Sequence, residues 1–271
     1  MTESLPNNRM SERFRNAYAK MLEADGENIW RLHKQYEDFP DLARFICEFY
    51  FNEVGSRRVL TPRMREAIVI GALLAKGTFA DPLASHMVSG YKAGLSLPEL
   101  RELVLLTLGY TGAPNGSTGG RRALAAVEEL VEKETGSPVD KEATYPDLQG
   151  KERAEHGCEL LKAGGGQQAD RFLEKYTQHT TLMDLFVSYI YGDLHARTVL
   201  DEQTKAMAVL SIINAVGRSK DMLCLQVQTA VNAGCSREML EEACLLHAAY
   251  LGFVNAFTLA EAIDTVLTAQ D

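Results

Sequence analysis

The sequence lacks several features that would place it in a specialised class of protein. Its five cysteines form no Cys-x-x-Cys pair and no metal-ligand spacing, so we expect reduced and mostly buried thiols. The longest apolar runs are too short to cross a bilayer, and we predict no membrane partner. The N-terminus has no apolar core of the kind that a secretory signal needs, which favours a cytoplasmic location.

Positive charge is also scarce. The chain has 28 Lys and Arg residues against 37 Asp and Glu residues, for a formal net charge of −9. This balance argues against nucleic acid or an anionic membrane surface as a partner, because either would need a basic surface. An anionic small molecule needs only local cations and stays open as a substrate. With 46% hydrophobic residues in 271, the chain can bury a substantial core.

An internal repeat organises the chain at a shift of 140 residues. Residues 57–115 laid over residues 197–255 without a gap give 18 identities in 59 positions. Glycine and proline punctuate a polar stretch near residues 135–150, as expected of a junction. We therefore predict a first repeat over residues 1–135, a linker over 136–150 and a second repeat over 151–271.

Each repeat has helical spacing and no convincing alternating strand. In the first, a capping residue and a proline at 61–62 open one helix, and residues 81–94 carry start and stop signals for the next. Residues 96–99 have capping-box spacing and open a third helix. The predicted fold is all-α, with two equivalent helical bundles packed as pseudo-symmetric halves.

Two glycine-rich segments need a structural interpretation. Residues 115–120 lack the lysine and Ser/Thr pattern of a phosphate-binding P-loop and follow no strand. Their glycines are expected to loosen a helix start or to make room beside a pocket. Residues 163–167 are predicted to be a loop between helices.

Two residues suited to proton transfer lie on neighbouring predicted helices. Glu66 opens a segment that is apolar or glycine from residue 67 to residue 75, and His86 shares a helix face with Leu83 and Met87. A carboxylate and an imidazole aimed at one core suit general acid–base catalysis. The alternatives are a solvated first-turn carboxylate and a core histidine, and whether the two side chains touch stays open.

The two repeats differ at these positions. Glu66 is replaced by Ala206 in the overlay, and His86 is replaced by Gln226. One repeat therefore keeps the candidate acid–base pair, and the other has lost it.

The order and spacing of these motifs resemble the carboxymuconolactone decarboxylase and alkylhydroperoxidase D-like family. The resemblance lies at Arg65-Glu66, Ser85-His86, Ala93-Gly94, Glu102-Leu103 and residues 110–114, and again at residues 191–197, 232–234 and 250–252. It covers most of the chain outside the N-terminus and the junction. It implies the all-α fold of that family and catalytic roles for Glu66 and His86.

The peroxidase branch of this family carries a Cys-x-x-Cys pair that is missing here. Phe79 and Pro82 occupy those places in the first repeat, and Ser219 and Met222 occupy them in the second. Without a resolving partner, a lone thiol does not restore the dithiol chemistry. The resemblance therefore favours the decarboxylase branch.

That branch works on a small lactone acid without a metal or organic cofactor, so none is predicted here. It needs a cation for the substrate carboxylate, and Arg57, Arg58 and Arg197 lie at the family's arginine position. A structural salt bridge is the alternative for each arginine. His195 stands where the decarboxylases usually have tryptophan, so it is a further candidate for substrate binding.

Three functions remain open from the sequence. The preferred one is a cofactor-independent lyase or isomerase, acting on a small carboxylate or lactone by acid–base chemistry. The others are a thiol peroxidase-like antioxidant protein and a non-catalytic binding or scaffold protein. Single-copy members of the family assemble as trimers or as hexamers built from dimers, so the resemblance implies a homotrimer that resembles such a hexamer.

Overall fold

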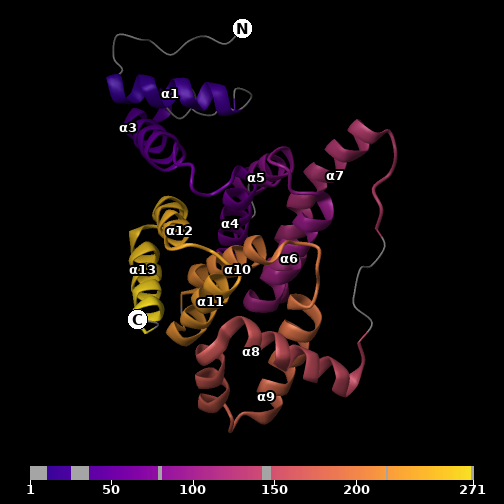
Figure 1. Cartoon of the computed structure of the whole chain (residues 1–271). Helices are drawn as coiled ribbons and strands as arrows, with labels where there is room; N and C mark the ends of the chain where they lie inside the picture. Colours follow the sequence, from indigo (N-terminus) through magenta and orange to yellow (C-terminus); the bar gives the residue numbers. More distant parts are fainter. Residues whose placement is uncertain (1–10, 26–36, 79–80, 142–147, 218, 270–271) are drawn as a thin grey trace. The chain divides into compact units, whose positions relative to one another are not determined.

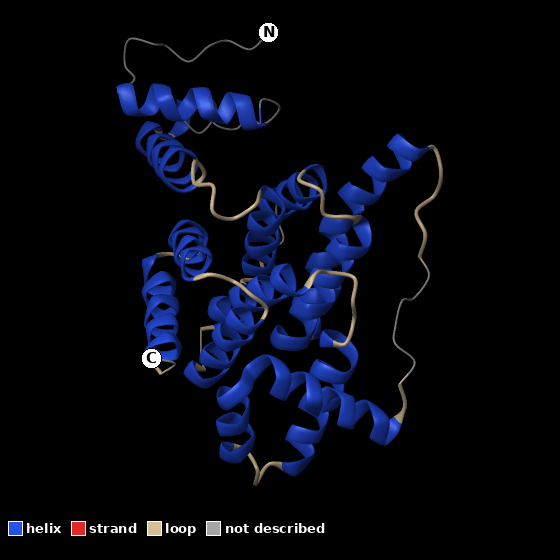
Figure 2. Cartoon of the chain, viewed as in Figure 1, coloured by secondary structure: helices blue, strands red, loops and turns tan. Residues whose placement is uncertain are grey.

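The computed structural model describes residues 11–25, 37–78, 81–141, 148–217 and 219–269. Every regular element in these ranges is a helix, and no strand is present in them (Figure 2). The all-α prediction is therefore confirmed. In the same residues, no helix combines the length and the apolar character needed to span a membrane.

The chain divides into two compact units, residues 1–59 and residues 60–271. The first unit contains α1 (Glu12–Asp25), α3 (Pro40–Phe45) and the π-helix η3 (Ile46–Val54). Four buried residues form its core: Phe14, Ala17, Ala43 and Cys47. The division between the units falls within the first predicted repeat, and the predicted boundaries at 1–135, 136–150 and 151–271 stay a prediction.

The second unit holds the remaining elements (Figure 1). In chain order they are α4 (Pro62–Ala75), α5 (Asp81–Lys92), α6 (Leu97–Thr111), η4 (Asn115–Gly120), α7 (Arg121–Thr135), α8 (Gly150–Lys175), α9 (Thr180–Leu185), η5 (Phe186–His195), α10 (Glu202–Val216), α11 (Lys220–Asn232), α12 (Arg237–Tyr250) and α13 (Phe253–Thr268). The bounds of α4, α5 and α6 recur in α10, α11 and α12 close to the 140-residue shift of the sequence repeat.

Helices α4 and α10 pack against each other at the core of this unit. Residues 67–75 of α4 and residues 204–215 of α10 are all buried. The two backbones approach closely at Gly71, where an added Cβ would lie 3.0 Å from the Ala208 carbonyl oxygen. This close crossing joins the two predicted halves and leaves only the ends of both helices near solvent.

The predicted helix starts are confirmed by hydrogen bonds. The Thr61 side chain accepts the Met64 amide at 3.2 Å and Pro62 begins α4, as the sequence indicates. At α6, the Ser96 and Glu99 side chains form a complete capping box. These bonds fix where α4 and α6 begin and hence the register of their buried faces.

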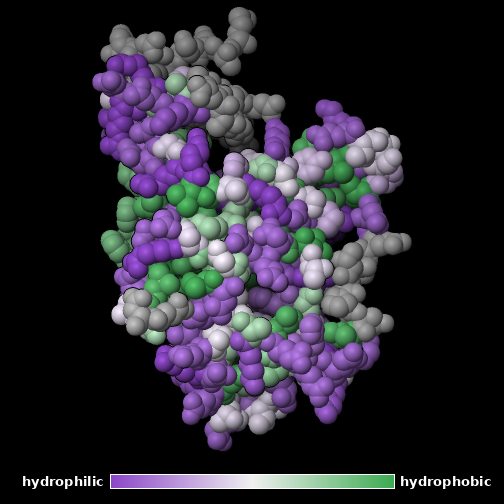
Figure 3. Space-filling view, in the orientation of Figure 1, coloured by the Kyte–Doolittle hydropathy of each residue, from purple (hydrophilic) through white to green (hydrophobic). Residues whose placement is uncertain are grey.

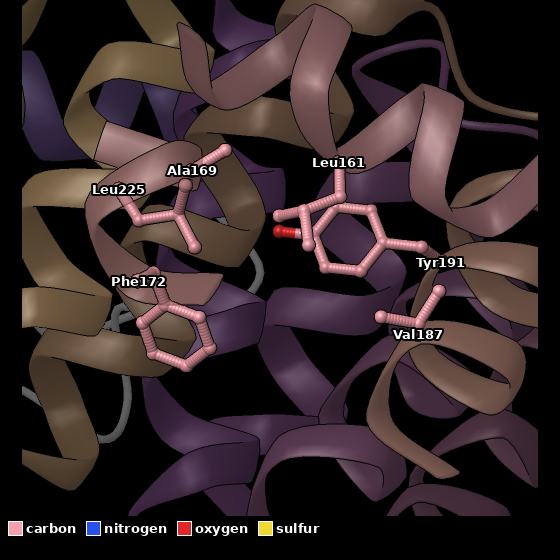
Figure 4. Close-up of a cluster of buried hydrophobic side chains, with 6 residues drawn as sticks. All are labelled: Leu161, Ala169, Phe172, Val187, Tyr191 and Leu225. Atoms are coloured by element: carbon pink, nitrogen blue, oxygen red, sulfur yellow. The ribbon is translucent and has the colours of Figure 1, made fainter. Parts of the chain in front are cut away.

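Residues 163–167, predicted to be a loop between helices, form a kink between two helical segments of α8. Within these residues, Gly166 alone leaves the helical conformation, with φ of 49° and ψ of −134°. An added Cβ at Gly165 would lie 2.3 Å from Leu225 Cδ1, so glycine lets α8 pack closely on α11. The apolar cluster beside this contact comprises Leu161, Ala169, Phe172, Val187, Tyr191 and Leu225 (Figure 4).

The surface is mainly hydrophilic on the face seen in Figure 3, with hydrophobic residues between the polar ones. Large hydrophobic side chains of the second unit that are exposed include Leu182, Leu185, Val216, Val254 and Phe257. Scattered exposed apolar residues are common in folded proteins. The candidate acid–base residues lie instead on α4 and α5 of this unit, where their side chains are only partly exposed.

Candidate active site

Glu66 and His86 meet between α4 and α5. His86 Nδ1 lies 2.8 Å from Glu66 Oε2, and the two side chains are 21% and 18% exposed respectively. The pair is therefore sheltered from solvent without being sealed from it. The structure answers the question that the sequence left open, because the carboxylate and the imidazole are in direct contact.

The chemistry of the two groups constrains where the proton lies. An ionised carboxylate only accepts hydrogen bonds, so when Glu66 is ionised the proton of this contact lies on His86 Nδ1. The other ring nitrogen, Nε2, makes no bond to the carboxylate and is then the ring atom that can exchange a proton with another group. With this arrangement the carboxylate fixes the orientation of the imidazole ring, as in other carboxylate–imidazole pairs.

Gly90 lets α5 come close enough to α4 for this contact. An added Cβ would lie 3.0 Å from Ile70 Cδ1, 3.1 Å from Leu95 Cδ1 and 3.5 Å from Glu66 Cβ. Gly90 lies one turn beyond His86 on the same face, as the predicted apolar face requires. The corresponding residue of the second half is Ala230, which is fully buried.

The neighbouring Arg65 points toward the second half of the chain. Its Nη2 lies 2.9 Å from Glu242 Oε1 on α12, and the Glu242 side chain is only 3% exposed. This ion pair holds α12 beside the turn of α4 that carries Glu66. Tyr250, at the end of the same helix, packs its ring against the His86 imidazole in a T-shaped arrangement with centroids 5.2 Å apart.

The corresponding positions of the second half carry no acid–base pair. Gln226 Nε2 donates to the Ala206 carbonyl oxygen at 3.1 Å, and Gln226 is 1% exposed. An amide bonded to the backbone in the core does not exchange protons near neutral pH. The difference that the sequence overlay predicts is thus a difference between a partly exposed pair and an internal structural bond.

Arg57 and Arg58 belong to the first unit. Arg58 is exposed, and its Nη1 donates to the carbonyl oxygens of Gly55 at 3.0 Å and Arg57 at 2.8 Å. Both acceptors are backbone carbonyl oxygens just beyond the end of η3, so neither bond neutralises the guanidinium charge. The substrate-binding roles of both arginines stay predictions.

Arg197 is part of a buried charge cluster. Its Nε lies 3.3 Å from Glu102 Oε2, and Lys205 Nζ lies 3.3 Å from Glu102 Oε1. Glu102 has no exposed surface, and burial lowers the pKa of Lys205 although the carboxylate opposes this effect. The salt bridge that the sequence leaves as an alternative for Arg197 is present.

His195 lies among tyrosine side chains rather than beside a carboxylate. Its Nε2 is 2.7 Å from the Tyr110 hydroxyl, and its ring stacks on Tyr191 with centroids 4.6 Å apart. Burial, with a smaller effect of the Lys205 charge, lowers the pKa of His195 to about 3. His195 is therefore neutral at pH 7, and its role in substrate binding stays a prediction.

The cysteines carry no paired redox chemistry in the structure. All five are free thiols: Cys47, Cys158, Cys224, Cys235 and Cys244. Burial raises the pKa of Cys235 to about 11 and that of Cys244 to about 12, so both stay protonated at neutral pH. In the part of the chain that the structure describes, no three His, Cys, Asp or Glu side chains are grouped to hold a metal ion.

The sequence places Gly90 on the same helix face as His86 and includes Tyr250 in the family resemblance, but it does not predict the role of either residue at this site. Gly90 differs from the alanine at the corresponding position of the second repeat, and that difference is the signal that could have found it. Tyr250 is one of the identities between the repeats, but a shared tyrosine says nothing of which histidine it contacts. The contact depends on how α12 packs against α4.

Comparison with known proteins places the chain in a family. The model of the carboxymuconolactone decarboxylase family matches residues 40–129, which include Glu66 and His86. The chain is 30% identical over 121 residues to a 4-carboxymuconolactone decarboxylase of Acinetobacter baylyi, a match that covers 44% of this chain and 90% of that protein. The chain belongs to the carboxymuconolactone decarboxylase family.

Proposed function

We propose that the protein is a cofactor-independent lyase or isomerase of the carboxymuconolactone decarboxylase kind, acting on a small carboxylate or lactone. The observation that carries the proposal is the 2.8 Å contact between His86 Nδ1 and Glu66 Oε2 in a partly exposed setting. Family membership and the similarity to a protein named as a decarboxylase support the reaction class.

The pair can supply the proton that a decarboxylation needs. When the bond to the carboxylate carbon breaks, carbon dioxide leaves and the electron pair stays on the substrate carbon. His86 then donates the proton on Nε2 to that carbon, and Glu66 stabilises the imidazolium that holds the proton beforehand. Water restores the proton to the ring after product leaves. The same groups can move a proton between two carbons, which is the isomerase variant.

The substrate carboxylate needs a cation, and Arg57 with its neighbour Arg58 is our proposal for it. Both lie at the family's arginine position in the first repeat. We also propose that Arg197 and His195 bind the substrate. This role predicts a higher KM in Arg197→Lys and His195→Gln. An unchanged KM in both would limit their role to the clusters that they form with Glu102 and Tyr110.

The direct test incubates purified protein with 4-carboxymuconolactone and follows substrate absorbance together with released carbon dioxide. His86→Gln and Glu66→Gln should each lower kcat/KM by about 100-fold to 10,000-fold, the usual value of a general acid–base group. His156→Gln is the control, because the His156 side chain is 41% exposed and lies on α8. Equal activity in all variants would contradict the assignment of the pair.

Other outcomes of the same assay separate the remaining functions. Consumption of a hydroperoxide in the presence of a thiol reductant would favour the peroxidase-like alternative. Binding of the lactone without turnover would favour a non-catalytic binding protein.

The predicted tandem arrangement leads to a proposal for the assembly. A chain that contains two family units corresponds to a dimer made covalent, so we propose a homotrimer equivalent to a hexamer of single units. Light scattering coupled to size-exclusion chromatography tests it. A mass of one chain, near 29.9 kDa, would contradict the proposal.

A further inference from the structure

A tyrosine from the second half of the chain contacts the histidine of the first. The rings of Tyr250 and His86 have centroids 5.2 Å apart and planes inclined at 81°. Tyr250 is the last residue of α12, whereas His86 lies in the middle of α5. Edge-to-face contacts of this kind are a preferred arrangement of aromatic rings and restrict their rotation.

Helix α12 is fixed to α4 close to Glu66 by two sets of polar contacts. At one, Glu242 pairs with Arg65, the residue before Glu66. At the other, His247 Nε2 lies 2.9 Å from Ser211 Oγ, which in turn donates to the Ile68 carbonyl oxygen at 2.8 Å. Because both contacts are buried or nearly so, the end of α12 has a defined place relative to the helix that carries Glu66.

The tyrosine at the corresponding position of the first half provides a natural comparison. Tyr110 also forms a T-shaped contact with a histidine, His195, with centroids 6.0 Å apart and planes at 87°. Tyr110 additionally bonds that histidine through its hydroxyl, and its other aromatic neighbour is Tyr191. Only the Tyr250 contact involves a histidine that is held by a carboxylate.

We propose that Tyr250 is a positioning residue for His86. Its ring limits rotation of the imidazole, so that Nδ1 keeps facing Glu66 and Nε2 stays available to a substrate. The inference rests on the proposed function, because positioning matters for turnover only if His86 transfers a proton. It also gives the second half a role in a site whose acid and base both come from the first half.

The test compares Tyr250→Ala with Tyr250→Phe in the full-length protein, using both kinetics and ¹⁵N NMR of the histidine rings. Tyr250→Ala should lower kcat by about ten-fold with little change in KM, which is the order of an aromatic pair. In the same variant the ¹⁵N shifts of His86 should move toward those of a ring with mixed tautomers. Tyr250→Phe keeps the ring contact and should preserve both properties.

Tyr110→Phe is the matched control for the NMR experiment. It removes the hydroxyl that lies 2.7 Å from His195 Nε2, so the His195 shifts should change while the His86 shifts do not. If Tyr250→Ala does not fold, Tyr250→Leu removes the ring but keeps apolar volume. Wild-type ¹⁵N shifts for His86 in either of these two Tyr250 variants would overturn the inference.

The two proposals can fail separately. A wild-type protein without turnover would count against the proposed function, but the ¹⁵N shifts would still decide whether Tyr250 orients His86. Conversely, turnover that depends on His86 and is equal in wild type, Tyr250→Ala and Tyr250→Leu would retain the function and reject the positioning role.

Discussion

The two halves of the chain use the same pair of helix positions in different ways. In the first half, Glu66 and His86 form a partly exposed acid–base pair, whereas in the second half Gln226 bonds the Ala206 backbone inside the core. The bounds of the helices that carry them agree within one residue after a shift of 140 residues. The helices of the second half therefore fold without the acid–base pair, since an amide and a methyl group fill the same positions.

The ion pairs between the halves show the opposite behaviour. Glu102 of α6 contacts Lys205 of α10, and Glu242 of α12 contacts Arg65 of α4. Glu102 corresponds to Glu242 in the sequence overlay, and Arg65 corresponds to Lys205. Each half therefore supplies a carboxylate to a cation of the other half. The proposed chemistry therefore belongs to one half, whereas the charges that join the halves come from both.

The largest loss of stability is expected from a substitution that removes one of these ion pairs. Glu102→Gln should lower the free energy of unfolding by about 3–5 kcal/mol, because it leaves two enclosed cations, Arg197 and Lys205, without their carboxylate. Glu242→Gln should cost less, since its partner Arg65 is 15% exposed. Chemical denaturation of both variants measures the difference. Equal losses would show that the two ion pairs are energetically alike.

The next prediction concerns the space between α4 and α5. Gly90→Ala should destabilise the protein by about 1–3 kcal/mol, because the new methyl group meets Ile70 and Leu95 at close range. It should also reduce turnover by moving His86 away from Glu66. Ala230→Gly in the second half is the matched control, costing about 1 kcal/mol with no loss of turnover. Unchanged turnover in Gly90→Ala would contradict the role of this glycine.

The third prediction uses pH to distinguish the halves. Burial lowers the pKa of His247 to about 3, so this residue stays neutral in the folded chain below pH 6.5 while the unfolded chain takes up a proton. Its contribution to stability is therefore complete above pH 6.5 and is lost at about 1.4 kcal/mol per pH unit as the pH falls toward 3.

Denaturation curves from pH 7 to pH 4 test this dependence. His247→Gln should be less stable at pH 7, where its hydrogen bonds are lost, but its stability should fall less steeply with acid. The residue at the corresponding position of the first half is Thr107, which does not titrate. Parallel curves for wild type and variant would show that His247 does not cause the acid loss.

The smallest expected effect is at the helix starts. Thr61→Ala should cost about 1 kcal/mol by removing the acceptor for the Met64 amide. Asp201→Ala should cost somewhat more, because Asp201 both caps α10 and binds Arg63 across the halves. Thermal denaturation of the two variants gives the comparison, and a smaller loss at Asp201 would contradict it.

Local features of the fold were predictable from the sequence. The capping residue at Thr61 and the capping box at Ser96 depend on side chains within three residues of the bonds that they form. The buried face of α4 followed from an unbroken apolar segment, and His86 was predicted to face inward from its spacing with Leu83 and Met87. Each of these inferences needs only one helix.

Features that depend on two helices were harder to predict. The contact of Glu66 with His86 needs the close approach that Gly90 allows, and no local pattern gives that distance. The glycines of residues 163–167 predict a loop between helices, and the structure reduces it to a kink at Gly166 within α8, whose packing against α11 no local pattern indicates. The partner of Arg197, Glu102, lies 95 residues away in the chain.

The reciprocal ion pairs bear on whether the molecule could be divided. A cut in the junction near residues 136–150 would leave Glu102 in one fragment and its two cations in the other, with Arg65 and Glu242 separated in the same way. Each fragment alone would carry buried charges that have lost these partners. We therefore expect the fragments to be insoluble when expressed singly and to reassemble when expressed together, as a split protein does.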